Sequence, residues 1–343
     1  MEMIFALDKS IVILLNFTFE MINRKNRLQP RDRRGFFLND VISLDHFDRK
    51  SILKLFKETK KLKKIKGKKL LKILSGKLAA LVFFEPSTRT FSSNSAAFKR
   101  LGGQTIEHQN PASTSSSVKG ESIEDMARMF EQYCDVIVVR HPVIGTLERI
   151  AGAANVPVIN AGDGIGEHPT QALLDMFTIW EKFGKLTGLK GLMAGDMLNG
   201  RTVHSLIRGL SIFPGNTVYL LSPKQLCLSR EEFRLYSKRG VKLIEIDSLN
   251  QIPEDCHFWY WTRVQKERFK DKKVYEKLKL SFILTKKLVK ERAGKDTLLM
   301  HPLPRVGEIE TAVDSDQRAV YLTTEARNGM YVRMALFKLI LKG

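Results

Sequence analysis

The sequence predicts an α/β protein with two domains, each a parallel β-sheet flanked by helices. Short apolar runs alternate with amphipathic stretches along most of the 343 residues, as expected for parallel strands connected by helices. The alternation falls into two sets that meet near residues 162–168. The chain length agrees with this division, because a domain commonly holds about 100–150 residues.

The first set begins with an amphipathic helix, since Ile52, Leu53, Leu55 and Phe56 form one apolar stripe. Short apolar runs then predict buried strands, and amphipathic segments between them predict helices. The predicted strands are 77–84, 134–141 and 156–162, and the predicted helices are 93–103, 147–154 and 168–184.

The second set continues the same alternation after Gly184, which is typical of a helix end. A last helix is predicted near the C-terminus, and a serine-rich segment at 113–120 is predicted to be a polar loop. The predicted strands are 189–196, 216–223, 241–246 and 256–262, and the predicted helices are 201–213, 229–240 and 329–341.

The net charge of +20 raises the question of nucleic-acid binding. Residues 22–35 carry six basic side chains against one acid, and residues 57–72 carry nine against one. Most of the excess charge therefore lies in two short segments. The second segment is most simply the solvated face of a helix with a basic tail on a connecting turn. We therefore do not expect nucleic acid to be the principal partner.

The three cysteines are scattered at Cys134, Cys227 and Cys256, with no CxxC spacing. This pattern predicts neither a disulfide framework nor a zinc site, and it favours a reducing, cytoplasmic location. No stretch approaches the roughly 20 apolar residues that span a bilayer, so no membrane partner is expected. The best candidate, 11–22, is short and contains Asn16 and Glu20.

Polar segments follow several predicted strands, where parallel sheets usually bind ligands. The first is "STRT" at 87–90, between a strand and a helix, where unpaired N–H groups favour an anion. A simpler interpretation is an ordinary helix cap, because Ser and Thr are common in that position. Arginines recur at such positions, and guanidinium groups match carboxylates and phosphates. The sequence therefore predicts a cleft for a ligand with several negative charges, lined by Arg89, Arg140, Arg201 and Arg263.

Seven segments occur in an order that resembles a known family. They are "FFEPSTRT", "SSVKGES", "VVRHP", "HPTQALLDMFTI", "GRTVHSL", "TRVQKER" and "HPLPR". Together they resemble the catalytic chains of the aspartate carbamoyltransferase family, within the aspartate/ornithine carbamoyltransferase superfamily. The similarity runs from about Leu38 to the C-terminus.

The resemblance implies transfer of the carbamoyl group of carbamoyl phosphate to L-aspartate, giving N-carbamoyl-L-aspartate and phosphate in pyrimidine biosynthesis. It implies no metal, no cofactor and no covalent intermediate. It also implies a carbamoyl phosphate-binding domain at 37–167, to which a C-terminal helix at 326–343 returns, and an aspartate-binding domain at 168–325.

The resemblance also assigns individual residues. Those that would bind carbamoyl phosphate are Ser87, Thr88, Arg89, Thr90, Arg140, His168, Gln171, Leu303 and Pro304. Those that would bind aspartate are Lys119, Arg201, Arg263 and Gln265. Ser115 and Lys119 would come from the neighbouring subunit of a homotrimer with shared active sites. Glu85, Arg201 and Arg268 would bridge the two domains as they close over the substrates.

The family geometry further implies that the Leu303–Pro304 peptide bond is cis. His168 is expected to act as a hydrogen-bond donor rather than a base, because the leaving phosphate can accept the amine proton.

The chain departs from the family pattern immediately after "STRT". Phe91 and Ser95 stand where the family usually has an arginine and a glutamate. Both charges are absent together, so no unpaired charge is left behind. We interpret the change as looser support around the residues that bind the substrate directly. Two alternatives stay open: a carbamoyltransferase with another amine acceptor, and an inactive paralogue that acts as a binding or scaffold protein.

Residues 1–36 form an N-terminal extension outside the resemblance. It could be an addition without a role, the product of a mispredicted start, or a contact to another enzyme of the pathway. A transit peptide would be richer in serine and poorer in acids. The sequence does not decide whether regulatory chains or nucleotide effectors act on this protein.

Overall fold

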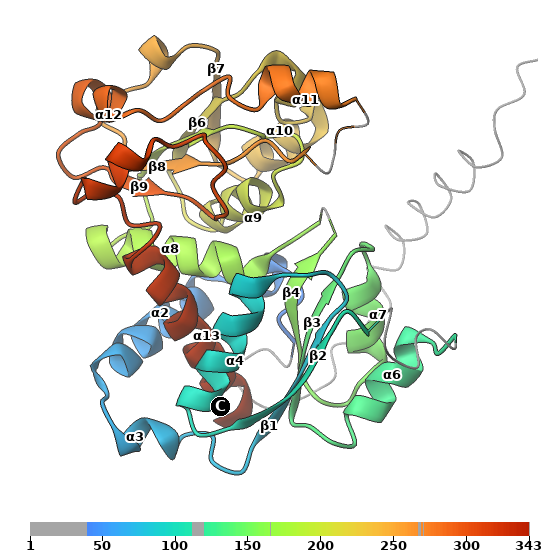
Figure 1. Ribbon diagram of the computed structural model, residues 1–343. Helices are drawn as coiled ribbons and strands as arrows, with labels where there is room; N and C mark the ends of the chain where they lie inside the picture. The colour runs from blue at the N-terminus through green and yellow to red at the C-terminus, as the bar shows by residue number, and fades with distance from the viewer. Residues whose placement is uncertain (1–39, 112–119, 165, 267–268, 270, 343) are drawn as a thin grey trace, which may run out of the picture. The chain divides into compact units, whose positions relative to one another are not determined.

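The protein contains two parallel β-sheets flanked by helices, which confirms the predicted fold class (Figure 1). The structure is a computed structural model. The predicted N-terminal extension lies outside its described residues, as does the serine-rich loop except for Gly120. The described residues are 40–111, 120–164, 166–266, 269 and 271–342.

The first sheet has the strand order β2-β1-β3-β4, and all its pairings are parallel. Its strands are β1 (Leu78–Phe83), β2 (Gln104–Gln109), β3 (Val136–His141) and β4 (Val158–Asp163). Because side chains alternate along a strand, Leu81 and Phe83 of β1 enter one core cluster, whereas Ala80 and Val82 enter another. Both faces of β1 are therefore covered, as parallel sheets require.

Helices cover each face of this sheet. Residues of α2, α4, α8 and α13 join the core cluster on one face, and residues of α6 and α7 join the cluster on the other, as Figure 1 also shows. The helices around the first sheet are α2 (Arg49–Lys64), α3 (Lys68–Leu71), α4 (Thr88–Arg100), α6 (Ile123–Phe130) and α7 (Thr146–Ala153).

The second sheet has the order β7-β6-β5-β8-β9 and is also entirely parallel. Its strands are β5 (Lys190–Ala194), β6 (Thr217–Leu221), β7 (Lys242–Ile246), β8 (Phe258–Trp261) and β9 (Leu298–Met300). The helices that accompany it are α9 (Arg201–Leu210), α10 (Arg230–Lys238), α11 (Lys272–Leu278) and α12 (Lys286–Arg292). Strand β8 is buried along its whole length, including Trp259 and Trp261.

Two long helices connect the parts of the core. Helix α8 (Pro169–Phe183) packs against β4, α9 and α13, and most of its side chains are buried. It begins with a proline, which suits the first helical turn, and ends at Gly184 in the left-handed conformation. Helix α13 (Thr324–Lys342) packs against α8, α2 and α4, so the C-terminal helix returns to the first sheet.

The structure adds elements that the apolar pattern did not predict. Strand β2 is the polar edge strand "QTIEHQ", and β9 has only three residues, so neither gives a strong signal. The basic tail predicted as a turn contains the short helix α3, and the lysines around it are largely exposed, as a solvated face requires. No helix among the described residues is both long enough and apolar enough to cross a membrane.

We expect Phe337→Ala to destabilise the protein strongly. The Phe337 side chain is 1% exposed, and its ring centroid lies 4.9 Å from that of Phe98 in an edge-to-face pair between α13 and α4. A cavity at this position should lower the free energy of unfolding by about 3–5 kcal/mol. Denaturant titration followed by circular dichroism measures the change.

The matched control is Leu322→Ala, because Leu322 is 52% exposed. That change should stay within about 0.5 kcal/mol. Equal losses in the two variants would contradict the structural role assigned to α13.

Candidate active site

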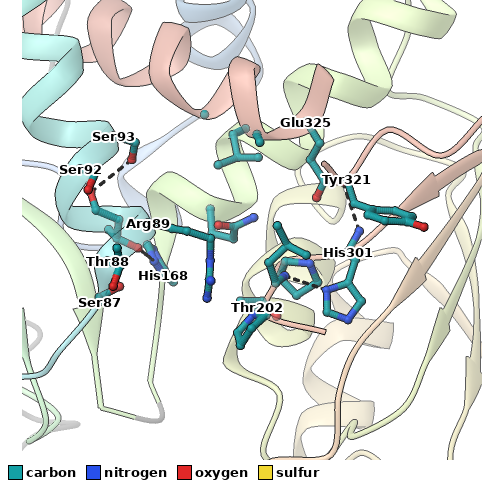
Figure 2. A pocket seen from close by; sticks show the side chains of 18 of the residues that line it. Ser87, Thr88, Arg89, Ser92, Ser93, His168, Thr202, His301, Tyr321 and Glu325 are labelled. Carbon is teal, nitrogen blue, oxygen red and sulfur yellow. Dashed lines mark hydrogen bonds between the residues drawn. The ribbon is translucent and has the colours of Figure 1, made fainter. Parts of the chain in front are cut away.

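A cavity of about 770 Å³ opens where the chain leaves strands of both sheets. The carboxyl ends of parallel strands meet at one edge, so polar segments far apart in the sequence come together here. Figure 2 shows Ser87, Thr88 and Arg89 on one side of the cavity and His301 and Tyr321 on the other.

The structure brings most of the predicted site residues to this cavity. Those that line it are Glu85, Ser87, Thr88, Arg89, Thr90, Arg140, His168, Gln171, Arg201, Arg263, Gln265, Leu303 and Pro304. The other three, Ser115, Lys119 and Arg268, lie outside the described residues.

The N-terminus of α4 faces the cavity. Ser87 occupies the cap position but its side chain makes no capping hydrogen bond, and no acidic residue lies in the first turn. Backbone N–H groups and the positive end of the helix dipole therefore remain available to an anion. The pKa of Arg89 is lowered by burial and by the nearby charge of Arg263. An anion between these two guanidinium groups would relieve their repulsion.

Arg140 reaches the cavity from the end of β3 and is only 9% exposed. Its Nη2 lies 3.1 Å from Glu85 Oε2, and its Nη1 donates to the Ala161 carbonyl at 3.3 Å. Burial lowers the pKa of Arg140, and Glu85 opposes that effect. A side chain at Gly162 would bring a Cβ to 2.6 Å from Nη1, so a glycine there leaves room for the guanidinium group.

His168 is buried at the N-terminus of α8, with Thr90 Oγ1 3.4 Å from its Nε2 and Thr170 Oγ1 3.5 Å from its Nδ1. Its pKa lies well below the ordinary value because burial penalises the imidazolium, and the charges of Arg201, Arg140 and Arg333 add to this. The ring is therefore neutral near pH 7. A neutral imidazole can donate one hydrogen bond into the cavity.

The second sheet contributes Arg201 and the segment after β8. Arg201 is the first residue of α9, and its guanidinium group donates to the Gly164 carbonyl of the first half of the chain. Gln265 Nε2 donates to the Asn199 carbonyl at 2.6 Å, which holds this side chain beside the loop before α9. These contacts place donors for a second anionic group across from the N-terminus of α4.

The segment after β9 enters the cavity with a fixed conformation. The Leu303–Pro304 bond is cis, as expected from the resemblance. The Leu303 N–H lies 2.7 Å from His301 Nδ1, so this nitrogen is the acceptor and Nε2 carries the proton. Nε2 then donates to Glu308 Oε1 at 2.7 Å. His301 is thus a structural anchor for the backbone that lines the cavity.

Two family models match consecutive parts of the sequence, which together cover most of it. The aspartate/ornithine carbamoyltransferase carbamoyl-P binding domain matches residues 39–181, and the Asp/Orn binding domain of the same family matches residues 187–340. The chain belongs to the aspartate/ornithine carbamoyltransferase family.

Relatives within this carbamoyltransferase family are similar over nearly the whole chain. The aspartate carbamoyltransferase catalytic subunit of Methanobrevibacter smithii is 43% identical, over 90% of this chain and 96% of its own. The chloroplastic enzyme of Arabidopsis thaliana is 42% identical, over 91% and 80%.

Solved structures of the family share the fold. The catalytic subunit of M. jannaschii aspartate transcarbamoylase superposes with a TM-score of 0.82 at 40% identity, covering 89% of this chain and 98% of its own. The Trypanosoma cruzi enzyme in complex with N-(phosphonacetyl)-L-aspartic acid superposes with a TM-score of 0.78 at 34% identity, covering 88% and 95%.

The two carbamoyltransferase domain models meet between residues 181 and 187. Our boundary at 167/168 stays a prediction.

The two departures from the carbamoyltransferase pattern have local partners. Phe91 packs edge-to-face on Phe83 at 5.1 Å between ring centroids. Ser95 Oγ donates to Glu107 Oε1 at 2.7 Å, beside a 2.9 Å contact from Lys99. Burial raises the pKa of Glu107, but these donors outweigh it and lower the value to about 2. Position 91 has become part of the core, and position 95 connects α4 to β2.

Sequence reasoning missed several residues that line the cavity of this carbamoyltransferase. Among them are Thr202, Thr262, His301, Tyr321, Glu325 and Arg333. Arg333 and Asp175 could have been noticed, because each interrupts a run of apolar residues, "MYVRMALF" and "ALLDMFTIW". Within the part of the chain that the structure describes, no group of three or more His, Cys, Asp or Glu side chains could hold a metal ion.

We expect His168 to remain neutral across the pH range in which an ordinary histidine titrates. Its pKa is held well below the usual value by burial and by three arginines. Histidine-selective NMR should show no titration of its ring between about pH 6 and pH 8. The spectrum of His168→Gln assigns the resonance, and a midpoint near the ordinary value would contradict the electrostatics described here.

Proposed function

We propose that this protein is an aspartate carbamoyltransferase, which moves the carbamoyl group of carbamoyl phosphate to the amine of L-aspartate. The products are N-carbamoyl-L-aspartate and phosphate, and the reaction serves pyrimidine biosynthesis. One observation carries the proposal: a single cavity is lined by an uncapped helix N-terminus with Arg89 and by Arg201 and Arg263 from the second half of the chain. The relatives named as aspartate carbamoyltransferases support it.

The phosphate group of the first substrate binds at the N-terminus of α4. Ser87, Thr88 and Arg89 supply hydroxyl, backbone N–H and guanidinium donors, and the helix dipole favours negative charge there. The same donors stabilise phosphate as the leaving group. The free phosphate then accepts the proton of the attacking amine, so the step needs no side-chain base.

The carbamoyl oxygen faces three donors. Attack by the amine places negative charge on this oxygen, and preorganised donors lower the barrier most where charge develops. Thr90, Arg140 and the neutral ring of His168 line the cavity from three different elements. Arg140 supplies a full positive charge, whereas His168 donates without adding to the repulsion among the arginines.

The carbamoyl amide is recognised by acceptors. Gln171 and the carbonyl groups of Leu303 and Pro304 line the same cavity. The two N–H bonds of the carbamoyl group require acceptors, which these oxygens provide. This set distinguishes a carbamoyl group from an acyl group that carries a methyl instead.

Aspartate binds against the second half of the chain. Arg201, Arg263 and Gln265 hold its two carboxylates and bring the amine toward the carbamoyl carbon. Positioning of this kind can supply several kcal/mol of the barrier, on the order of 7 kcal/mol or more in favourable cases. We also propose the domain boundaries. Residues 37–167 and 326–343 form the carbamoyl phosphate-binding domain, and residues 168–325 form the aspartate-binding domain.

The proposed assembly is a homotrimer with shared active sites. Ser115 and Lys119 reach the neighbouring subunit's cavity, with Lys119 as a further aspartate ligand. Glu85 and Arg268 help the two domains to close, which excludes water from the charged groups. We keep the cytoplasm as the proposed location, since all three cysteines in the described residues are free thiols.

Purified protein given carbamoyl phosphate should release phosphate and a ureido product with L-aspartate but not with L-ornithine. Arg263→Ala should raise the KM for aspartate about 10-fold or more, because it removes a charged hydrogen bond to a carboxylate. Arg128→Ala is the matched control, since that arginine is exposed on α6. Product with L-ornithine would instead identify ornithine as the amine acceptor. No product with either amine would favour the inactive paralogue.

Mixing two inactive variants should restore activity if sites are shared. Arg89→Ala removes a phosphate ligand within one subunit, and Lys119→Ala removes the residue offered to the neighbour. After subunit exchange, each mixed trimer contains one site with both residues intact, so it should show about one third of wild-type activity. A mixture no more active than its parents would contradict shared sites.

A further inference from the structure

A cluster of buried polar groups borders the cavity, and its member Glu325 lines the wall. Asp175 of α8 is fully buried, and Glu325 of α13 is 2% exposed. The two carboxyl groups interact with each other. Tyr260 of β8 joins them, and Figure 2 shows Glu325 reaching from α13 toward His301. Neither carboxyl group has a role in the reaction as described above.

The hydrogen bonds identify which carboxyl group carries a proton. Asp175 accepts at both oxygens, from Tyr260 Oη and from Gln171 Nε2, each at 2.9 Å. Glu325 Oε2 accepts from the His301 N–H at 3.2 Å, but no donor reaches its buried Oε1. Two ionised carboxylates cannot remain in contact in a buried site. A proton on Glu325 Oε1, donated to Asp175, satisfies every oxygen of the pair.

The surrounding charges agree with one negative charge rather than two. Arg333 of α13 is 3% exposed and interacts electrostatically with Asp175, so it balances one carboxylate. Burial, and then the charge of Asp175, raise the pKa of Glu325 far above its ordinary value. Burial also raises the pKa of Tyr260, which stays a donor. The neighbouring His301 donates to Glu308 and adds no charge to the pair.

The pair anchors both groups that recognise the carbamoyl amide. On one side, Asp175 engages the amide nitrogen of Gln171, which leaves the amide oxygen as the group free to accept from the cavity. On the other side, Glu325 holds the backbone of His301, whose ring accepts from the Leu303 N–H. The proton shared by Asp175 and Glu325 therefore determines the orientation of two acceptors, the Gln171 amide oxygen on α8 and the Leu303 carbonyl after β9.

We propose that Glu325 is a neutral carboxylic acid which donates to the Asp175 carboxylate, and that this pair positions Gln171 and Leu303 to select a carbamoyl over an acetyl group. Asp175 and Glu325 are positioning residues, since they act through the Gln171 side chain and the Leu303 carbonyl, which touch the substrate. The inference rests on the proposed function, because the selected group is part of carbamoyl phosphate.

The test is equilibrium binding of carbamoyl phosphate and of acetyl phosphate, which carries a methyl group in place of the amide. In Asp175→Asn the new amide can donate to Gln171, so the Gln171 side chain can turn its nitrogen toward the cavity. Binding of carbamoyl phosphate should weaken about 10-fold to 100-fold, while binding of acetyl phosphate changes less than about 3-fold. Glu325→Leu should show the same selective loss.

Two further variants separate positioning from general damage. Glu325→Gln keeps a neutral donor of the same shape and should restore most of the selectivity lost in Glu325→Leu. Thr178→Val removes a buried hydroxyl group from α8 one turn beyond Asp175, where it contacts Asn328 rather than Gln171. It should leave the ratio of the two affinities unchanged. Parallel losses for both ligands in Asp175→Asn would overturn the proposal.

Infrared spectroscopy tests the proton independently of ligand binding. The wild-type protein at neutral pH should show a carboxylic acid carbonyl band that shifts in D₂O and is absent from Glu325→Gln. A wild-type protein without this band would overturn the proposal, even if the selectivity data agreed. If the protein failed to bind carbamoyl phosphate at all, the proposed function would fall, whereas the infrared result would still decide whether Glu325 is protonated.

Discussion

The structure depends on holding several like charges around one cavity. Arg89, Arg140, Arg201 and Arg263 converge there, and the pKa of both Arg89 and Arg140 is lowered by burial. Repulsion among guanidinium groups disfavours such an arrangement unless rigid elements and acceptors hold them. The Ala161 and Gly164 carbonyls and the Glu85 carboxylate supply those acceptors. A ligand with two anionic ends would balance these positive charges.

Rigidity comes from the two sheets and from the helices that connect them. Arg140 lies on a buried strand, Arg89 and Arg201 lie in the first turns of helices, and Arg263 follows β8 by two residues. Helix α8 carries His168 and Gln171 into the cavity while its other residues pack against both halves of the chain. Helix α8 therefore connects the first sheet to the second. Keeping His168 neutral prevents a further positive charge in this region.

The sequence predicts most strands, most helices and the polar segments at strand ends, because these depend on local periodicity and residue type. It does not predict β2, whose polar side chains lack a strand signal and whose pairing with β1 decides its conformation. It also misses the pair of Asp175 and Glu325, which are 150 positions apart. Each looks like an isolated acid in the sequence, and only the packing of α13 on α8 gives it a partner.

The substituted positions after "STRT" make contacts that fix helix α4 to the first sheet. The family's usual arginine and glutamate would add one charge of each sign on α4, so their joint absence leaves the net charge near the phosphate side unaltered. In this chain Phe91 packs on Phe83 and Ser95 donates to Glu107. Helix α4 is thereby fixed to β1 and β2, its neighbours in the sheet. The N-terminus of α4 offers backbone N–H groups to an anion, so these contacts also fix the position of those donors.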